Sequence, residues 1–191
     1  MRIAEVDVLI QAGWENSGPG HWQRRWGERF PHAQFIEQDE WDRPQLGDWT
    51  GRIAREVMMA TRPVVLVAHS LGVPAVVHAA QEFKDTKVRG AFLVAPPDLE
   101  SPEVLAELPP ELHTFGNVPR DPLPFPSMVV ASTNDAFVTV ERAADMAAAW
   151  GAQLELAGAS GHINVASGHG PWPEGLLMFH QLMKRLRPQS L

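Results

Sequence analysis

The chain has 191 residues, of which 45% are hydrophobic and 20% charged, and its formal net charge is -7. This length and composition are typical of one folded domain with a buried core, so we expect residues 1–191 to form a single domain and exclude a disordered protein. The excess of negative charge, with no cluster of lysine and arginine, argues against binding to nucleic acid or to anionic membranes.

The sequence contains no cysteine, which excludes disulfides, thiolate nucleophiles and zinc sites built on cysteine. The first ten residues carry Arg2, Glu5 and Asp7, and no long apolar run follows them, so we expect no secretory signal. No apolar stretch approaches the roughly 20 residues that a membrane-spanning helix needs. We therefore expect a cytoplasmic protein without a membrane partner.

Apolar runs rich in β-branched residues alternate with segments of helical pattern, which predicts βαβ units and a mostly parallel sheet. Several of these runs are apolar throughout, as in strands that helices cover on both faces. In chain order we expect a strand at Val6–Ile10, a helix at about His21–Phe30, a strand at Gln34–Glu37, a helix at Leu46–Ala60, a strand at Val64–Ala68, a helix from just after Ser70 to about Phe83, strands at Val88–Ala95 and Ser127–Ser132, a helix at Glu141–Trp150, a strand at Gln153–Leu156 and a helix at Pro173–Leu186.

Residues 96–126 are unusually rich in proline. This density limits long helices and central strands, although it is compatible with a short helix at about Pro102–Leu108. The segment follows the C-terminal end of a predicted strand, which is where open α/β sheets bind their ligands. We therefore expect either a loop over the site or a rigid surface connection.

The sequence Ala68-His69-Ser70-Leu71-Gly72 lies between a predicted buried strand and a predicted helix. A serine in this context is typical of a nucleophile elbow, a sharp turn that exposes the serine oxygen above the sheet. Ala68 and Gly72 satisfy the need for small residues where the strand and helix backbones pass close together. The turn would place the Leu71 N–H at a helix N-terminus, where a developing oxyanion is favoured. The alternative is that Ser70 only caps the helix.

A serine nucleophile needs a base to take its proton and an acid to orient that base. His162, in a loop of small residues after the last predicted strand, is the expected base, with His169 as its rival. Asp135, just after the fifth predicted strand, is the expected acid, with Asp98 as its rival. Helix capping by Asp135 and a structural role for His162 are the alternatives. His69 should pack or form hydrogen bonds, because adjacent residues on the turn point in different directions.

A second donor to an oxyanion is expected in the loop after the first strand, which reads Gly13-Trp14-Glu15-Asn16-Ser17-Gly18-Pro19-Gly20-His21-Trp22. Its glycines allow the backbone to approach a ligand closely. We expect Trp14 or Gly13 to supply the N–H. The tryptophans of the chain either line an apolar pocket or fill the core.

Four motifs, taken together and in this order, resemble the retinoblastoma-binding-protein-nine/YdeN-type serine hydrolases, a compact branch of the α/β-hydrolase superfamily. The motifs are Gly13 to Trp22, Ala68 to Gly72, Ser132-Thr133-Asn134-Asp135, and Gly161-His162-Ile163-Asn164 with the following Ser167-Gly168. The resemblance implies an α/β-hydrolase fold with a six-stranded, mostly parallel sheet flanked by helices and no large lid domain.

The same resemblance implies a catalytic triad of Ser70, Asp135 and His162 and the hydrolysis of small ester, thioester or amide substrates. Two departures from the family pattern stand out. Ala68 replaces the usual first glycine of the elbow, which should be tolerated. Ala136 follows the acid where the family often has proline, which leaves open how firmly the acid loop is held.

The main expectation is thus a serine hydrolase that forms an acyl-enzyme on Ser70, acts on a small-molecule acyl substrate and needs no metal or cofactor. A protein partner is neither excluded nor indicated. One competing interpretation is a non-catalytic or weakly catalytic protein-binding module, since a fold does not fix a function. Another is a metal hydrolase that uses His21, His32, His162 or His169 with aspartates, although no His-Glu-x-x-His pattern supports it.

Overall fold

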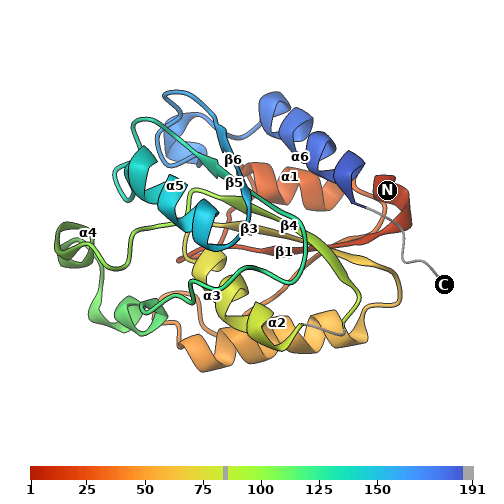
Figure 1. Cartoon of the computed structure of the whole chain (residues 1–191), viewed down its shortest axis with the longest axis horizontal. Coiled ribbons are helices and arrows are strands. Elements are labelled where there is room, and N and C mark those ends of the chain that lie inside the picture. Colours follow the sequence, from red (N-terminus) through yellow and green to blue (C-terminus); the bar gives the residue numbers. More distant parts are fainter. Residues whose placement is uncertain (84–85, 187–191) are drawn as a thin grey trace.

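A central sheet organises the chain in the computed structural model, which describes residues 1–83 and 86–186 (Figure 1). Its strands are β1 (Asp7–Gln11), β2 (Ala33–Phe35), β3 (Val64–His69), β4 (Val88–Val94), β5 (Ser127–Ala131) and β6 (Gln153–Leu156). The 6-stranded sheet has the order β2-β1-β3-β4-β5-β6, and each of these pairings is parallel. The predicted α/β-hydrolase architecture is therefore confirmed, with strand ends shifted by a residue or two.

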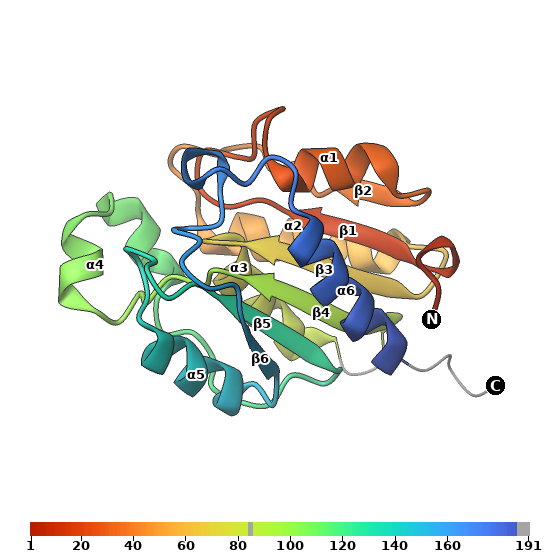
Figure 2. The ribbon, with the colours of Figure 1, turned by 90° about the horizontal axis from the view of Figure 1, so that it is seen from above.

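Helices cover both faces of the sheet. They are α1 (Trp22–Arg29), α2 (Leu46–Met59), α3 (Gly72–Ala79), α4 (Pro102–Ala106), α5 (Val140–Ala149) and α6 (Pro173–Arg185). The helix expected to reach about Phe83 is α-helical only to Ala79 and tightens into a 3-10 helix at Ala80–Glu82, and the sequence did not predict the other short 3-10 helices, at Ile3–Glu5, Pro110–Phe115 and Val165–Ser167. Helices α1 and α6 pack on one face, and α2, α3 and α5 pack on the other (Figures 1 and 2). Within the described residues, no helix is both long and apolar enough to cross a bilayer.

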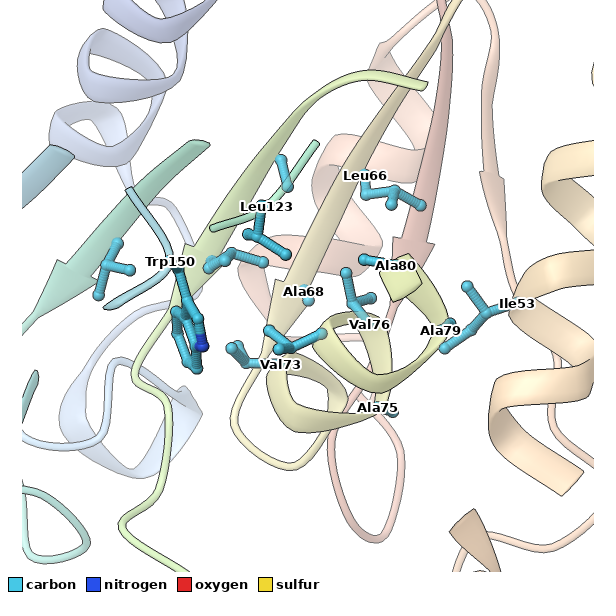
Figure 3. Packing of buried hydrophobic residues seen from close by; sticks show 14 of the residues in the cluster. Ile53, Leu66, Ala68, Val73, Ala75, Val76, Ala79, Ala80, Leu123 and Trp150 are labelled. Carbon is cyan, nitrogen blue, oxygen red and sulfur yellow. The ribbon is translucent and has the colours of Figure 1, made fainter. Parts of the chain in front are cut away.

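Strand β3 is buried along its whole length because its alternate side chains enter two different hydrophobic clusters. Val65 and Val67 join the cluster beneath α1 and α6. Leu66 and Ala68 join the cluster beneath α2, α3 and α5, where Figure 3 shows Ala68 beside Val76 of α3. A strand with both faces covered needs no polar alternation, which explains its continuous apolar sequence.

The first part of the proline-rich segment 96–126, which contains α4, lies at the end of the molecule opposite the N-terminus, and the rest runs back to the start of β5 (Figures 1 and 2). It contains α4, as predicted, although this helix ends two residues earlier than expected, at Ala106. Arg142 of α5 fastens the start of the segment, because its guanidinium pairs with Asp98 at 3.1 Å and also with Glu100. The Asp98 N–H donates to the carbonyl oxygen of Phe137 at 2.8 Å. The segment is therefore tied to the loop that follows β5.

The start of α3 lies against the end of β1 at Gly72. A Cβ atom at this position would lie 2.6 Å from the carbonyl oxygen of Ala12 and 2.8 Å from that of Gln11. Backbone atoms of a central strand cannot move away cheaply, so only glycine fits here without a shift. This contact explains why the second small position of the elbow is glycine.

Gly72→Ala should lower the free energy of unfolding by about 2 kcal/mol, because the added methyl group overpacks this contact. Gly51 provides a matched control, since it lies in α2, is exposed, and has no atom within 4 Å of an added Cβ. Gly51→Ala should raise the free energy of unfolding by about 0.5–1 kcal/mol. Urea unfolding measures both values. A Gly72→Ala protein as stable as the wild type would contradict the expected clash.

Candidate active site

Ser70 lies on a sharp turn between β3 and α3 and has a φ of 52°. Such left-handed backbone costs a residue other than glycine of order 1 kcal/mol or more and is concentrated at functional sites. The Ser70 N–H donates to the carbonyl oxygen of Val94 at 3.0 Å, which fastens the turn to β4. The N-cap of α3 is Leu71, and no side chain caps this helix. Ser70 is therefore not the helix cap that we considered as its alternative role.

The side chains of Ser70, His162 and Asp135 meet in one hydrogen-bonded chain. His162 Nε2 lies 2.8 Å from Ser70 Oγ, and His162 Nδ1 lies 2.9 and 3.0 Å from the two carboxylate oxygens of Asp135. A carboxylate can only accept, so Nδ1 carries the ring proton. Nε2 is then the acceptor for the Ser70 hydroxyl proton. The residues that the sequence singled out from three separate motifs are thus in contact.

The acid loop holds its carboxylate out of solvent. The Asp135 side chain is 0% exposed, and that of His162 is 13% exposed. The Phe137 N–H donates to Asp135 Oδ1 at 2.9 Å, and the Phe137 ring stands edge-on to the imidazole of His162 with centroids 4.7 Å apart. Phe137 thus fixes both groups from one position. The acid loop is fastened in this way although Ala136 stands where the family often has proline.

The loop that carries His162 is anchored on three sides. His69 Nε2 donates to the carbonyl oxygen of His162 at 2.9 Å, and Trp22 Nε1 donates to that of Ile163 at 3.0 Å. The Gly161 N–H donates to Asn134 Oδ1 at 2.7 Å. Ile163 is buried with a φ of 49°, an outlier for a β-branched residue that surrounding contacts must hold. His69 has the hydrogen-bonding role that the sequence suggested.

Residues of two loops that line this pocket have backbone N–H groups without an acceptor among the described residues. Among the described residues, no acceptor receives a hydrogen bond from the N–H of Leu71, Gly13 or Trp14. The loop after β1 is in close contact with the elbow, since a Cβ at Gly13 would lie 2.9 Å from Ser70 Cβ and 3.0 Å from the His69 carbonyl oxygen. All three expected donors line the pocket beside Ser70. A ligand atom there could accept from both loops.

The pocket over Ser70 has a volume of about 370 Å³. Its apolar walls are formed by Trp14, Leu71, Pro97, Leu108, Leu112 and Phe137. Pro97, Leu108 and Leu112 come from segment 96–126. Of the two alternatives that we considered, a loop over the site and a rigid surface connection, the structure therefore favours the loop over the site. Trp14 is the tryptophan that lines the pocket, whereas most of the others are buried in the core: Trp22, Trp26, Trp49, Trp150 and Trp172.

The rival residues have other partners. The His169 Nδ1 lies 3.1 Å from Ser167 Oγ, and Asp98 pairs with Arg142. Neither is hydrogen-bonded to Ser70 or His162. Within residues 1–83 and 86–186, no three His, Asp or Glu side chains converge in a way that could hold a metal ion.

Sequence reasoning missed the pocket roles of Phe137 and His21. For Phe137, the only indication in the sequence was its position two residues after the predicted acid, Asp135. His21 lines the pocket and caps α1, because its Nδ1 accepts the N–H of Gln23 at 3.2 Å. Its position after a glycine-rich loop and before an amphipathic segment could have indicated the cap. From the sequence we placed it at the start of a helix and named it as a metal ligand, but not as a cap or a pocket residue.

Two buried histidines beneath His162 are neutral at pH 7. Burial, with a smaller effect of the nearby His162, lowers the pKa of His21 to about 4. The same causes hold the pKa of the buried His69 well below its ordinary value. The rings of His21 and His69 lie 4.9 Å apart, so protonation of either would oppose protonation of the other.

These histidines should make the protein less stable in mild acid. Unfolded His21 binds a proton below about pH 6.5, whereas folded His21 stays neutral down to about pH 4, so the unfolded state gains protons and stability falls as the pH falls through this window. His21→Asn removes the titration and keeps a side-chain oxygen that can cap α1. The stability lost between pH 7 and 5 should be smaller in this variant by about 1–2 kcal/mol. Urea unfolding at both pH values measures the difference, and equal losses in variant and wild type would contradict it.

Comparison with known proteins agrees with this geometry. The model of the family described as serine hydrolase matches residues 8–181. The structure of a protein described as a YdeN-like hydrolase, from Pectobacterium atrosepticum, is 34% identical with a TM-score of 0.83 and covers 96% of this chain and 94% of that one. No curated protein matches the sequence.

More distant structures share the fold. The ydeN gene product of B. subtilis is 21% identical with a TM-score of 0.77, and the match covers 94% of this chain and 99% of that one. The esterase domain of a Rhodothermus marinus protein is 15% identical with a TM-score of 0.66, and the match covers 94% and 87%. With the family model spanning nearly all of the sheet and its helices, the chain belongs to the serine hydrolase family.

Proposed function

We propose that this protein hydrolyses small ester, thioester or amide substrates through an acyl-enzyme on Ser70. The observation that carries the proposal is the hydrogen-bonded chain from Ser70 Oγ through the His162 imidazole to the buried Asp135 carboxylate. This order of hydroxyl, imidazole and carboxylate is the constellation of acyl-transfer enzymes, and it recurs on unrelated folds because the chemistry requires it. Membership of the serine hydrolase family supports the same reaction class.

The reaction follows from the proton positions. His162 Nε2 takes the proton of Ser70 as Oγ attacks the acyl carbon, and the resulting imidazolium is stabilised by Asp135. Collapse of the tetrahedral intermediate breaks the bond to the leaving group, which takes the proton from Nε2. The acyl group is then an ester of Ser70. Water, deprotonated by the same imidazole, attacks this ester and releases the acid and the free serine.

The oxyanion of the tetrahedral intermediate would be bound by backbone N–H groups. We assign one donor to Leu71 and the other to Trp14 or Gly13, whose N–H groups have no acceptor among the described residues. The N-terminal end of α3 adds the favourable field of the helix dipole. One such donor typically contributes a factor of about 10² to 10³ in kcat.

The pocket favours a small substrate with an apolar part. Its volume of about 370 Å³ is at the lower end of the range for small-molecule sites, which is roughly 300–1,000 Å³. Hydrophobic side chains from segment 96–126 form one wall. We also propose the narrower grouping with the retinoblastoma-binding-protein-nine-type hydrolases, which rests on the four sequence motifs alone.

Ser70→Ala should abolish covalent labelling by a fluorophosphonate probe and lower the rate of ester hydrolysis by about 10³-fold or more. Intact-protein mass spectrometry detects the label, and hydrolysis of short-chain p-nitrophenyl esters gives the rate. Urea unfolding of the variant controls for loss of the fold. Folded wild type that takes up no probe, with Ser70→Ala hydrolysing esters at the same rate, would contradict the proposal. A protein partner retained equally by both proteins, without turnover, would instead favour the binding-module interpretation.

Asp135→Asn should keep the fold and the serine but lower kcat/KM by about 10⁴-fold, because an amide no longer fixes the imidazole proton on Nδ1. Asp98→Asn is the matched control, since Asp98 is also a carboxylate after a strand but pairs with Arg142. It should change kcat/KM far less. Ester hydrolysis by the two purified variants measures the contrast, and equal effects would remove Asp135 from the proposed mechanism.

A further inference from the structure

We infer that Glu15 makes the active site prefer substrates that carry a positive charge, such as an ammonium group, over uncharged substrates of the same shape. The inference rests on the proposed hydrolase function and adds a substrate class to it. Its starting point is that Glu15 lines the same pocket as Ser70 and His162. A carboxylate on the wall of a pocket attracts a cationic group that enters it.

The charges that face the pocket have one sign at neutral pH. Among the residues that the structure describes, no lysine or arginine lines it. The burial of His21 and His69 keeps both imidazoles uncharged at pH 7. The Asp135 carboxylate lies behind His162 and has no exposed area. Glu15 is therefore the fixed charge on the pocket wall, and the net charge of -7 on the whole chain acts in the same direction.

The Glu15 carboxylate has no internal partner. Glu15 is exposed, and no hydrogen bond or ion pair involves its side chain in the part of the chain that the structure describes. Arg24, whose guanidinium is hydrogen-bonded to this loop, donates to the Ser17 carbonyl at 2.7 Å, to Asn16 Oδ1 at 3.1 Å and to Glu37 at 3.3 Å. The charge of Glu15 thus stays available to a ligand.

The backbone under Glu15 is fixed in an unfavourable conformation. Glu15 and Asn16 have φ values of 59° and 65°, which residues other than glycine rarely adopt. The Glu15 N–H donates to the Trp41 carbonyl and the Asn16 N–H to that of Gly13, each at 3.2 Å. Trp14 Nε1 donates to the Asp42 carbonyl at 3.0 Å. The turn therefore fixes the backbone of Glu15 at the pocket wall at a cost in backbone strain, which is typical of functional positions.

Two pairs of isosteric substrates isolate the effect of charge. Acetylthiocholine and 3,3-dimethylbutyl thioacetate differ only at the end of the leaving group, which is a trimethylammonium group in the first and an uncharged tert-butyl group in the second. The p-nitrophenyl esters of 4-(trimethylammonio)butanoate and 5,5-dimethylhexanoate place the same difference in the acyl part. We expect the ratio of kcat/KM for the charged to the uncharged member to fall about fivefold in Glu15→Gln for at least one pair, at low salt. The same ratio should fall for the wild type as salt is added.

Glu28→Gln is the matched control, because Glu28 is an exposed glutamate on α1 that does not line the pocket. It changes the net charge by the same amount and should leave both ratios unchanged. Equal ratios in wild type, Glu15→Gln and Glu28→Gln, with the uncharged esters hydrolysed, would overturn the inference but not the proposed function. If wild type cleaves none of the four substrates, the inference also fails, and fluorophosphonate labelling of Ser70 decides the proposed function separately.

Discussion

The hydrogen bond between Ser70 and His162 is the constraint around which this fold is arranged, because it joins loops that the sheet keeps apart. Ser70 follows β3 and His162 follows β6, and β4 and β5 lie between these strands. The loop after β6 must therefore cross two strand ends to place an imidazole nitrogen 2.8 Å from the hydroxyl. A loop that long would lose considerable entropy on ordering. Hydrogen bonds donated by His69 and Trp22, and one that Asn134 Oδ1 accepts from the Gly161 N–H, fix it in place.

Two buried histidines, His69 and His21, hold the loops around the site, and their protonation state determines the charge beneath it. His69 donates to the His162 carbonyl and His21 caps α1, and both roles place imidazole rings in the buried layer beneath the site. Burial keeps these rings neutral, so they supply polar contacts without adding cations next to an imidazole that must become positive during the proposed reaction. A charged residue in either place would oppose that step. The histidines thus meet two requirements at once, which are a polar anchor and an uncharged surrounding.

The parts of the site that the sequence predicted are those encoded locally. Ser70 stands in a five-residue motif after an apolar strand, and Asp135 and His162 each follow a strand in the order that this fold requires. The contacts that hold these residues are not local: His69 and His162 are 93 residues apart, and Trp22 and Ile163 are 141 apart. No pattern in one sequence specifies such pairs. The exact strand ends and the short 3-10 helices were missed for a similar reason. Local sequence preferences are weak at the ends of elements, and tertiary contacts decide at which residue an element ends.

The reacting groups and the pocket walls lie on different loops, so substitutions in the walls can change which substrate binds without changing the reaction. The serine, carboxylate and imidazole follow β3, β5 and β6, and hydrogen bonds to neighbouring segments hold them in place, so substitutions there would disturb the site itself. The pocket walls come from elsewhere, with Leu108 and Leu112 on segment 96–126 and Glu15 on the loop after β1. These two loops lie on the surface and tolerate substitution more readily than strands do. Replacing Glu15 can therefore alter which charge the pocket accepts, because among the described residues its side chain has no hydrogen-bond or ion-pair partner that would be lost.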